Sequence, residues 1–341
     1  MKRASTGLAV SALLASVASC SNGPSIDLPG GGPGIGFDDL RWSPRLGRVL
    51  APAARTGDLD LVDPVDHTVT AIGGFSTSDQ YDGGHDFGVT STDDTGSWLL
   101  ATDRTTGTIN VVDAQARTIV SNAPLGGNPD YVRWVASTNE AWVTEPGGQR
   151  IEIFRLAPGA TADAAPTPEH VGNIAVIGGP ESLVIDATRN RAYTHLWNGA
   201  TVAIDLSSRT IVATWSNGCS DSRGIVLDEP RGMLLTSCAE GRATALDVTT
   251  GQILDEVWAA DGLDVIDYDP NLHHLYLAGQ IDATLAIVGV SSTGEMAVLG
   301  TMGTTVLAHC VVSDGSRHVF VCDQNGGALL VRDDPYDAIT Q

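Results

Sequence analysis

Four aspartates and two adjacent histidines lie within residues 261–279, DGLDVIDYDPNLHHLYLAG. Carboxylate oxygens suit Ca²⁺, and imidazoles added to them suit a transition metal. A metal held by such side chains could also activate a water molecule and hydrolyse an ester or a lactone. The stretch is therefore either a metal site or one copy of a structural repeat.

The elements around this stretch favour a repeat. The chain contains a recurring unit of four short apolar strands separated by polar turns, and the innermost strands of its copies begin at Asp38, Phe87, Asp130, Glu181, Arg223, Asp264 and Ala308. A period of roughly 41–51 residues with four strands per unit is typical of a β-propeller blade. Such a small sheet cannot cover both of its faces alone, and packing against its neighbours around an axis covers them. The sequence therefore predicts an all-β fold, a seven-bladed β-propeller of four-stranded antiparallel blades over residues 37–341.

An aspartate ends the third strand of several copies, at Asp63, Asp113, Asp205 and Asp247. We expect each carboxylate to accept backbone N–H groups of the following turn. The runs SRGIVLDEPRGMLLTSC, INVVDAQARTIVSNAPLG and GLDVIDYDPNLHHLYLAG resemble the YVTN-type repeats of extracytoplasmic β-propellers, and the resemblance extends from residue 37 to about residue 333. That family includes binding proteins, surface proteins and enzymes, so the resemblance implies a fold and no particular activity.

Two segments depart from the regular repeat. One is FSTSDQYDGGHDFG, which precedes the second blade, and the other is RLAPGATADAAPTPEHV in the third blade. We interpret the second, which is rich in proline, as a surface loop.

The repeat register gathers polar residues at one rim of the central channel. The candidate ligand or metal residues there are Asp38, His85, Asp130, Glu181, His195, Arg223, Asp264 and His309. His273 and His274 fall instead in the turn between the two inner strands, and the sequence predicts that water covers them.

Two functions are compatible with this rim. The favoured one is a non-catalytic scaffold that binds a small-molecule ligand or a protein partner. The alternative is a metal-dependent, lactonase-like hydrolase that uses Asp38, Asp130, Glu181 and Asp264, with Ca²⁺ or a transition metal as its cofactor. No catalytic residue is predicted, because the sequence lacks a nucleophile elbow, a Walker-type loop and a dinucleotide fingerprint. A role as the partner of a redox enzyme forms a third class, and no motif points to it.

Four cysteines remain after Cys20, namely Cys219, Cys238, Cys310 and Cys322. An even number in an exported protein favours disulfides, for which three connectivities are possible. The register favours two local bridges. Cys219 and Cys238 share one rim, whereas Cys310 and Cys322 lie on facing strands with a diagonal offset. A four-cysteine zinc site is the alternative, although the paired CxxC spacing is missing.

The N-terminus looks like a processing signal. Lys2 and Arg3 precede an apolar run that is too short to span a bilayer, and Val17-Ala18-Ser19-Cys20 resembles a bacterial lipobox. We therefore predict a signal peptide over residues 1–19, a lipid on Cys20 and a flexible linker over residues 20–36. In a Gram-negative host, Ser21 would favour the outer membrane.

The overall charge limits the partners. A formal charge of −22 repels nucleic acid and anionic lipid, so the sequence predicts no nucleic-acid partner and contact with a membrane through the lipid anchor only.

The sequence does not decide which segment forms the fourth strand of the last blade. Either YDAIT near the C-terminus or residues before Asp38 could supply it.

Overall fold

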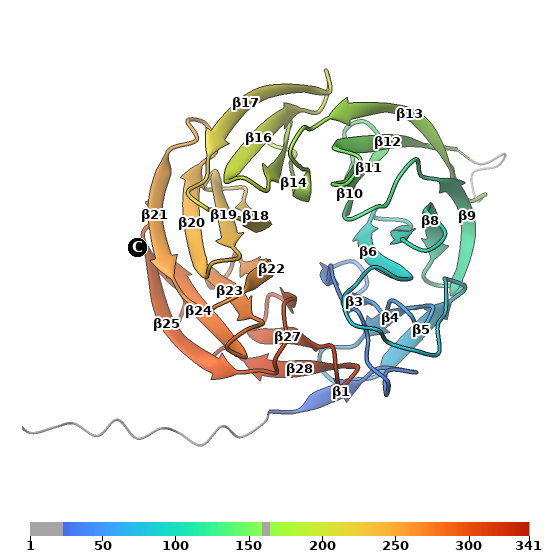
Figure 1. The fold of residues 1–341 in the computed structure, drawn as a ribbon, viewed down its shortest axis with the longest axis horizontal. Helices are drawn as coiled ribbons and strands as arrows, with labels where there is room; N and C mark the ends of the chain where they lie inside the picture. Colours follow the sequence, from blue (N-terminus) through green and yellow to red (C-terminus); the bar gives the residue numbers. More distant parts are fainter. Residues whose placement is uncertain (1–22, 159–163, 341) are drawn as a thin grey trace, which may run out of the picture.

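The computed structural model describes residues 23–158 and 164–340, and all of the regular structure in these ranges is β-strand. Seven four-stranded antiparallel sheets stand as blades around a central axis (Figure 1). The predicted seven-bladed β-propeller is confirmed. In the described ranges no helix is long and apolar enough to cross a membrane. The predicted signal peptide and Cys20 lie outside the described residues.

Blades one to six each use four consecutive strands, ordered from the axis outward. Blades one to three consist of β2 (Arg41–Ser43), β3 (Arg48–Pro52), β4 (Asp58–Val62) and β5 (Val69–Gly73); β6 (Val89–Asp94), β7 (Leu99–Asp103), β8 (Thr108–Asp113) and β9 (Thr118–Pro124); and β10 (Val132–Val135), β11 (Glu140–Glu145), β12 (Arg150–Ala157) and β13 (Thr167–Ala175).

Blades four to six consist of β14 (Glu181–Asp186), β15 (Arg191–Leu196), β16 (Ala200–Asp205) and β17 (Thr210–Ser216); β18 (Ser222–Asp228), β19 (Met233–Cys238), β20 (Arg242–Asp247) and β21 (Ile253–Trp258); and β22 (Leu263–Asp269), β23 (His274–Gly279), β24 (Thr284–Val290) and β25 (Met296–Gly303). The seventh blade joins β26 (Val311–Ser313), β27 (His318–Asp323) and β28 (Ala328–Asp333) to β1 (Ser25–Asp27).

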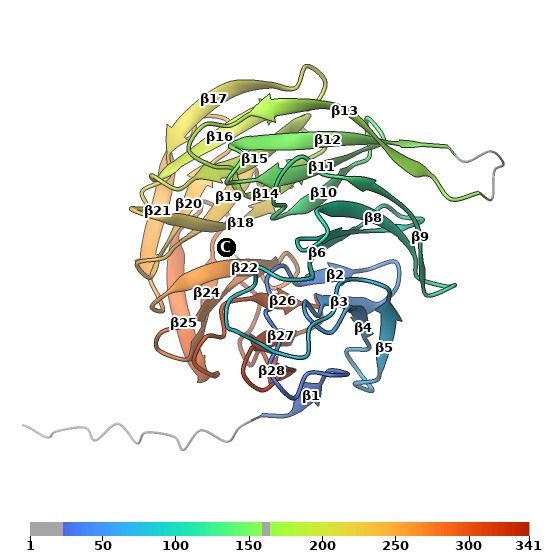
Figure 2. The ribbon, with the colours of Figure 1, turned by 45° about the vertical axis from the view of Figure 1, so that its right-hand side comes forward.

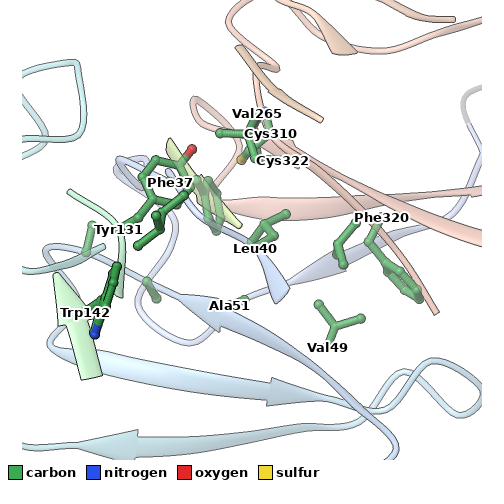
Figure 3. Packing of buried hydrophobic residues seen from close by; sticks show 14 of the residues in the cluster. Phe37, Leu40, Val49, Ala51, Tyr131, Trp142, Val265, Cys310, Phe320 and Cys322 are labelled. Atoms are coloured by element: carbon green, nitrogen blue, oxygen red, sulfur yellow. Dashed lines mark hydrogen bonds between the residues drawn. The ribbon is translucent and has the colours of Figure 1, made fainter. Parts of the chain in front are cut away.

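Alternating side chains on the strands bury both faces of the blades. Leu99 and Ala101 of β7 pack in a cluster shared with the first blade, whereas Leu100 between them packs in a cluster shared with the third blade. Successive residues of a strand point to opposite faces, so one short apolar run serves two interfaces. Each fully buried side chain of this size contributes about 1.5–3 kcal/mol. Figure 3 shows the largest cluster, in which Phe37 and Trp142 are completely buried.

The aspartates that end the third strands stabilise the turns as predicted. The carboxylate of Asp113 accepts the backbone N–H groups of Gln115 and Ala116, both at 2.8 Å. Asp63, Asp205 and Asp247 each accept the N–H groups two and three residues further on in the same way. Their role is structural.

The N-terminal segment closes the ring. Ser25–Asp27 pairs antiparallel with β28, opposite Ala328–Leu330. Pro24 O accepts the N–H of Val331 at 2.8 Å, and Leu28 N–H donates to Gly327 O at 3.1 Å. The fourth strand therefore comes from residues before Asp38, and YDAIT forms no strand.

Much of the segment expected to be a flexible linker is therefore built into the propeller. Arg55 holds it in place, since its guanidinium donates to Gly34 O at 2.6 Å and to Gly30 O at 2.7 Å. Gly31 packs so closely on Gly327 that a Cβ there would lie 2.3 Å from Gly327 O. A composition rich in glycine serves this close backbone approach rather than flexibility.

The structure corrects the prediction that water covers His274. His274 begins β23 and has no exposed surface. Its Nδ1 lies 2.6 Å from Asp334 Oδ2, and its Nε2 lies 3.1 Å from Asp337 O. The C-terminal segment covers this position, which local sequence does not reveal. His273 stays in the turn and is part-exposed, with its Nδ1 3.0 Å from the Tyr268 hydroxyl.

The two longer segments have different positions. The one in the third blade extends β12 and β13 into a hairpin that projects from the ring (Figure 2); residues 159–163 at its tip lie outside the described ranges. The other, residues 75–88, lies at the channel mouth, where Tyr81 O–H donates to Gln324 Oε1 at 3.0 Å.

Candidate functional site

One face of the ring carries the starts of the innermost strands and the loops between second and third strands; we call it the mouth face. A cavity of about 390 Å³, the mouth pocket, opens there. It is lined by His85, Asp86, Arg104, Asn128, Pro129, Asp130, Pro146, Gly147, Glu181, Trp197, Asp221 and Arg223.

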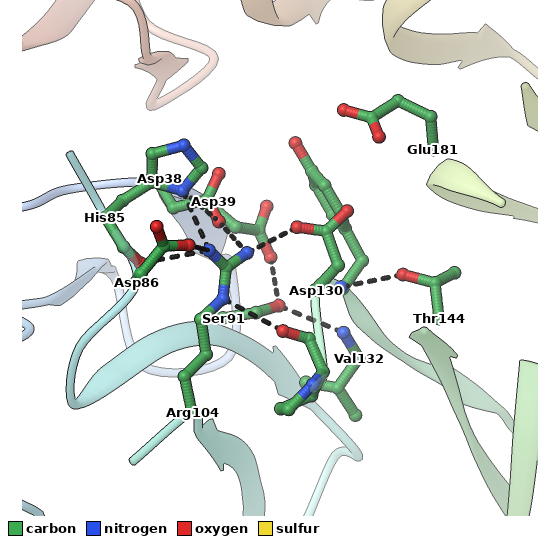
Figure 4. A network of polar contacts seen from close by, with 12 residues as sticks. Asp38, Asp39, His85, Asp86, Ser91, Arg104, Asp130, Val132, Thr144 and Glu181 are labelled. Carbon is green, nitrogen blue, oxygen red and sulfur yellow. Dashed lines mark hydrogen bonds and ion pairs between the residues drawn. The ribbon is translucent and has the colours of Figure 1, made fainter. Parts of the chain in front are cut away.

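Arg104 lies between the two carboxylates of the first and third blades. Its guanidinium donates to Asp38 Oδ2 at 2.7 Å and also to Asp130 Oδ1 (Figure 4). The Nε group donates to Pro129 O at 2.9 Å, and Nη1 donates to His85 O at 2.9 Å. The Arg104 side chain is 4% exposed. A side chain of the protein thus occupies the place between Asp38 and Asp130 where a bound cation would have to lie.

The electrostatics of these two carboxyl groups differ. Burial favours the neutral form of Asp38, but the charges of His85 and Arg104 outweigh it and hold the pKa of Asp38 well below its usual range. Burial and the charge of Asp38 raise the pKa of Asp130 well above its usual range. Two close carboxylates that share one cation separate in pKa in this manner.

The opposite side of the pocket holds Glu181 and Trp197. The indole N–H of Trp197 donates to Glu181 Oε2 at 2.6 Å, and the indole is 40% exposed. Arg223 Nη1 lies 3.7 Å from Glu181 Oε1. Burial, together with the charge of Asp264, raises the pKa of Glu181 to about 7. Burial likewise raises the pKa of Asp264.

The structure brings most of the predicted rim residues together. Asp38, His85, Asp130, Glu181, Arg223 and Asp264 lie at the mouth face, close enough to influence one another's charge. His309 lies next to them, with its ring centroid 5.6 Å from that of His85. Their gathering is therefore observed, whereas their role as ligands stays a prediction.

His195 is the exception. It lies within β15 rather than in a loop, and its side chain is completely buried. Nδ1 lies 2.9 Å from the Thr201 hydroxyl and 3.3 Å from Asn217 Nδ2. Burial lowers the pKa of His195 to about 3, so the ring is neutral and structural. It does not line the mouth pocket.

Arg104, Trp197 and Gln324 share a position that sequence reasoning did not exploit. Each directly follows the second strand of its blade, after β7, β15 and β27. Each contacts a rim residue, since Gln324 Nε2 lies 3.1 Å from His309 Nδ1. The sequence already places Trp197 in the same predicted rim loop as His195, and aligning the repeats at this position would have added Arg104 and Gln324.

A second ion pair lies deeper along the axis. Arg133 donates to Asp39 Oδ2 at 2.6 Å and to Asp39 Oδ1 at 2.9 Å, and both side chains are buried. Asp39 follows Asp38 on the same segment, while Arg41, two residues further on, lines a cavity of about 280 Å³. Arg133 lines the same cavity, so the buried pair lies at the wall of this second cavity.

The cysteines follow only half of the prediction. Cys219 and Cys238 form a disulfide with a Cα–Cα distance of 5.2 Å, within the usual range. Cys310 and Cys322 are free, buried thiols in the structure, so the second predicted bridge is not formed. Their strands place them directly opposite each other instead of diagonally, because Val311 pairs with Val321 and Cys322 N–H donates to Cys310 O at 3.0 Å.

Within the described ranges, the group of side chains spaced to share a metal ion is His309, Cys310 and Cys322. The carboxylates that the hydrolase hypothesis requires are not grouped in this way. The mouth pocket offers charged groups, hydrogen-bonding groups and one aromatic ring for recognition.

These features define a seven-bladed β-propeller with an acidic mouth and buried ion pairs that join its first three blades. No family model and no curated protein matches the sequence. Solved structures with this fold include a chain in "Crystal Structure of Mitotic Checkpoint Complex", at a TM-score of 0.74 and 14% identity, covering 98% of this chain and 99% of that one.

Two further structures are similar. Hydrazine synthase of Kuenenia stuttgartiensis matches with a TM-score of 0.70 and 14% identity, over 96% of this chain and 100% of that one. The Cps50 (Swd1) β-propeller domain of Myceliophteria thermophila matches with a TM-score of 0.69 and 11% identity, over 91% of this chain and 99% of that one. At these identities the likeness shows the fold alone.

Proposed function

We propose that the protein is a non-catalytic binding scaffold of the cell envelope, anchored by a lipid on Cys20, whose mouth face receives a partner protein that carries basic side chains. The observation that carries the proposal is the position of the exposed large apolar side chains. Six of the eleven among the described residues lie at the mouth end of the blades, namely Ile177, Trp197, Ile281, Val306 and Leu307 in its loops and Trp258 as the last residue of β21. Exposed apolar groups rimmed by polar ones are typical of protein-binding surfaces.

The opposite face offers much less. In the described part of the chain, only Val65 in the β4–β5 turn is a large apolar side chain exposed there, and the remaining four lie on the outermost strands, namely Ile211, Val212, Leu254 and Val298. Both faces are built from turns and loops, yet the exposed apolar side chains are concentrated on one of them. This difference favours a binding role for the mouth face.

Charge selects the kind of partner. Six carboxyl groups lie at or beside the mouth pocket against two arginines. They are Asp38, Asp86, Asp130, Glu181, Asp221 and Asp264. Since Arg104 already bridges two of them and Arg223 donates to Asp221 Oδ2 at 2.8 Å, the groups left for a partner are chiefly Asp86, Glu181 and Asp264. Lysine or arginine side chains on the partner would complement this charge and accelerate association. One structural neighbour belongs, by its printed name, to a protein complex, which is compatible with this role.

The path of the chain supports the same orientation. Pro24 is bonded to Val331, near the end of β28 that lies away from the mouth face. Cys20 precedes Pro24 by four residues, a reach of about 14 Å at most. A lipid on Cys20 would therefore hold the face opposite the mouth near the membrane and leave the mouth pocket accessible.

A photo-crosslinking residue at position 197 of the full-length chain in cell envelopes would test the docking face, with the same residue at position 65 as the control. The captured protein would then be purified, and its affinity measured for wild type, Trp197→Ala and Val65→Ala. We expect a loss of at least tenfold for Trp197→Ala, no change for Val65→Ala, and weaker binding at higher salt. Equal effects of both substitutions, or an affinity insensitive to salt, would refute the proposal.

Two further assays address the anchor and the rival function. Metabolic labelling with an alkyne fatty acid should mark wild type but not Cys20→Ser, and a label that persists in the variant would disprove the anchor. Hydrolysis of a lactone and ester panel with added Ca²⁺, Zn²⁺ or Mn²⁺, lost in Glu181→Gln, would replace the scaffold by the hydrolase.

A further inference from the structure

His309, Cys310 and Cys322 form a compact group of potential metal ligands that the proposed scaffold function does not use. One ligand atom from each lies within 4.8 Å of the others, and all three side chains are buried. Cys322 Sγ lies 3.9 Å from His309 Nδ1, which lies 2.9 Å from Leu307 O, while His309 Nε2 is buried without a hydrogen-bond partner among the described residues and is the nitrogen free to bind an ion. We propose that these three side chains bind one soft monovalent cation, Cu⁺.

The spacing of the three ligand atoms, all within 4.8 Å of one another, is compatible with one shared ion. Two metal–sulfur bonds of about 2.3 Å allow sulfurs up to roughly 4.6 Å apart, whereas a disulfide requires about 2.05 Å. The chain already contains one formed disulfide, Cys219–Cys238. Cys310 and Cys322 remain thiols although they face each other across an antiparallel pair of strands.

The backbone is also arranged around the sulfur. In a regular hydrogen-bonded pair both residues exchange N–H···O bonds. Here Cys322 N–H donates to Cys310 O, but the N–H of Cys310 donates to Cys322 Sγ at 3.2 Å. An N–H group directed at sulfur stabilises a thiolate, which is the form that binds metal.

The ligand set indicates which ion is preferred. Two thiolates and an imidazole are soft donors, which select Cu⁺ or Zn²⁺ over Ca²⁺ and Mg²⁺. Zn²⁺ prefers four ligands, and a site with three protein ligands completes its shell with water. His309 is 3% exposed and both cysteines are completely buried, so the site has little access to water. Cu⁺ is satisfied by three ligands.

The mouth pocket supplies a path for the ion. The His309 ring lies 5.6 Å from the ring of His85, whose side chain is 35% exposed at the pocket. The acidic mouth raises the local concentration of cations. On binding, each thiol releases its proton to solvent, two bonds to sulfur and one to nitrogen form, and the oxidation state of copper does not change.

The experiment uses the full mature chain, reduced and freed of metal, and titrates it with Cu⁺ in competition with a chromophoric Cu⁺ chelator under anaerobic conditions. We expect one equivalent of Cu⁺ per chain and a thiolate-to-copper absorption band in the ultraviolet. Cys310→Ser, Cys322→Ser and His309→Asn should each weaken binding by at least a hundredfold. His67→Asn is the matched control and should retain the full affinity, because His67 lies in the β4–β5 turn and asparagine tolerates its φ of 61°.

A second measurement avoids substitutions that could disturb folding. Because both thiols are completely buried in the folded chain, alkylation is followed in urea at concentrations that expose them; one equivalent of Cu⁺ should slow the alkylation of Cys310 and Cys322 in the wild type, and Zn²⁺ should slow it less. Less than 0.1 equivalent of bound Cu⁺, unchanged binding in Cys310→Ser and Cys322→Ser, or mass spectrometry of the protein from envelopes showing a Cys310–Cys322 disulfide would each overturn the proposal. None of these outcomes bears on partner binding through Trp197.

Discussion

Replacing Arg104 with methionine removes the cation that Asp38 and Asp130 share and leaves both carboxyl groups buried. Breaking a buried ion pair by removing one partner costs about 3–5 kcal/mol, because the remaining charge has lost its compensation. Arg104→Met also leaves Pro129 O and His85 O without the donors that lie 2.9 Å away. At about 2 °C per kcal/mol for a chain of this size, Tm should fall by roughly 6–10 °C near pH 7.5.

The effect should depend on pH with a definite sign. In the wild type the pKa of Asp38 lies below its unfolded value, so its stabilisation is present above pH 4 and is lost as the pH falls further. In Arg104→Met the buried carboxyl groups should have raised pKa values, so the variant should gain stability as the pH falls from 7.5 towards 4.5. The difference between the two proteins should therefore narrow in acid.

Urea unfolding followed by tryptophan fluorescence at pH 4.5, 6.0 and 7.5 would measure both effects, with Arg117→Met as a control at an exposed arginine. Adding Asp38→Asn and Asp130→Asn to Arg104→Met should recover most of the loss, because the amides need no cation. A loss under 1 kcal/mol at pH 7.5, or a difference between variant and wild type that does not change with pH, would refute the assignment of Arg104 as the resident cation.

Three other predictions concern stability. Replacing Cys219 and Cys238 with alanine should lower the free energy of unfolding by about 3 kcal/mol, because their bridge closes a loop between residues 19 apart. A reductant should lower the urea midpoint of the wild type and leave that of the double variant unchanged. Asp60 is buried, its oxygens have no hydrogen-bond partner among the described residues, and burial raises its pKa to about 8. Because this pKa exceeds the unfolded value, the stability of the wild type should fall as the pH rises from 4 to 8. Urea titrations over this range should show a smaller pH dependence for Asp60→Asn. Gly31→Ala should cost about 1–3 kcal/mol by pushing the chain off Gly327, visible as faster hydrogen exchange in β28, and unchanged exchange would contradict it.

The fold could be predicted from the sequence because the blades repeat the same local sequence pattern. Apolar alternation and a period near 45 residues recur in every clear copy, a turn aspartate such as Asp113 recurs in four of the blades, and all of these features act over short distances. Ring closure could not be predicted in the same way. Three residues, Ser25–Asp27, provide the last strand from within a stretch rich in glycine and proline, and only the position of β28 makes them a strand.

The same distinction explains the mouth face. The register places Asp38, Asp130, Glu181 and Asp264 at one end of the channel, since each blade repeats the same strand order and its innermost strand begins at the same end of the axis. It does not show which side chains lie between them. Arg104 donates to Asp38 and Asp130, which are 66 and 26 residues away in the sequence. Nothing in its own turn, TDRTTG, indicates these distant partners.

The register alone therefore overestimates how many rim carboxylates are left unpaired. The arginine that neutralises two of them comes from a different position of the repeat. In this propeller that position is the residue after the second strand, which carries Arg104, Trp197 and Gln324 in three blades. Arginine there cancels a pair of carboxylates, tryptophan donates to a third, and glutamine contacts His309 beside the two thiols. The starts of the innermost strands thus supply the carboxylates of the mouth, and the residues after the second strands decide how several of them are paired.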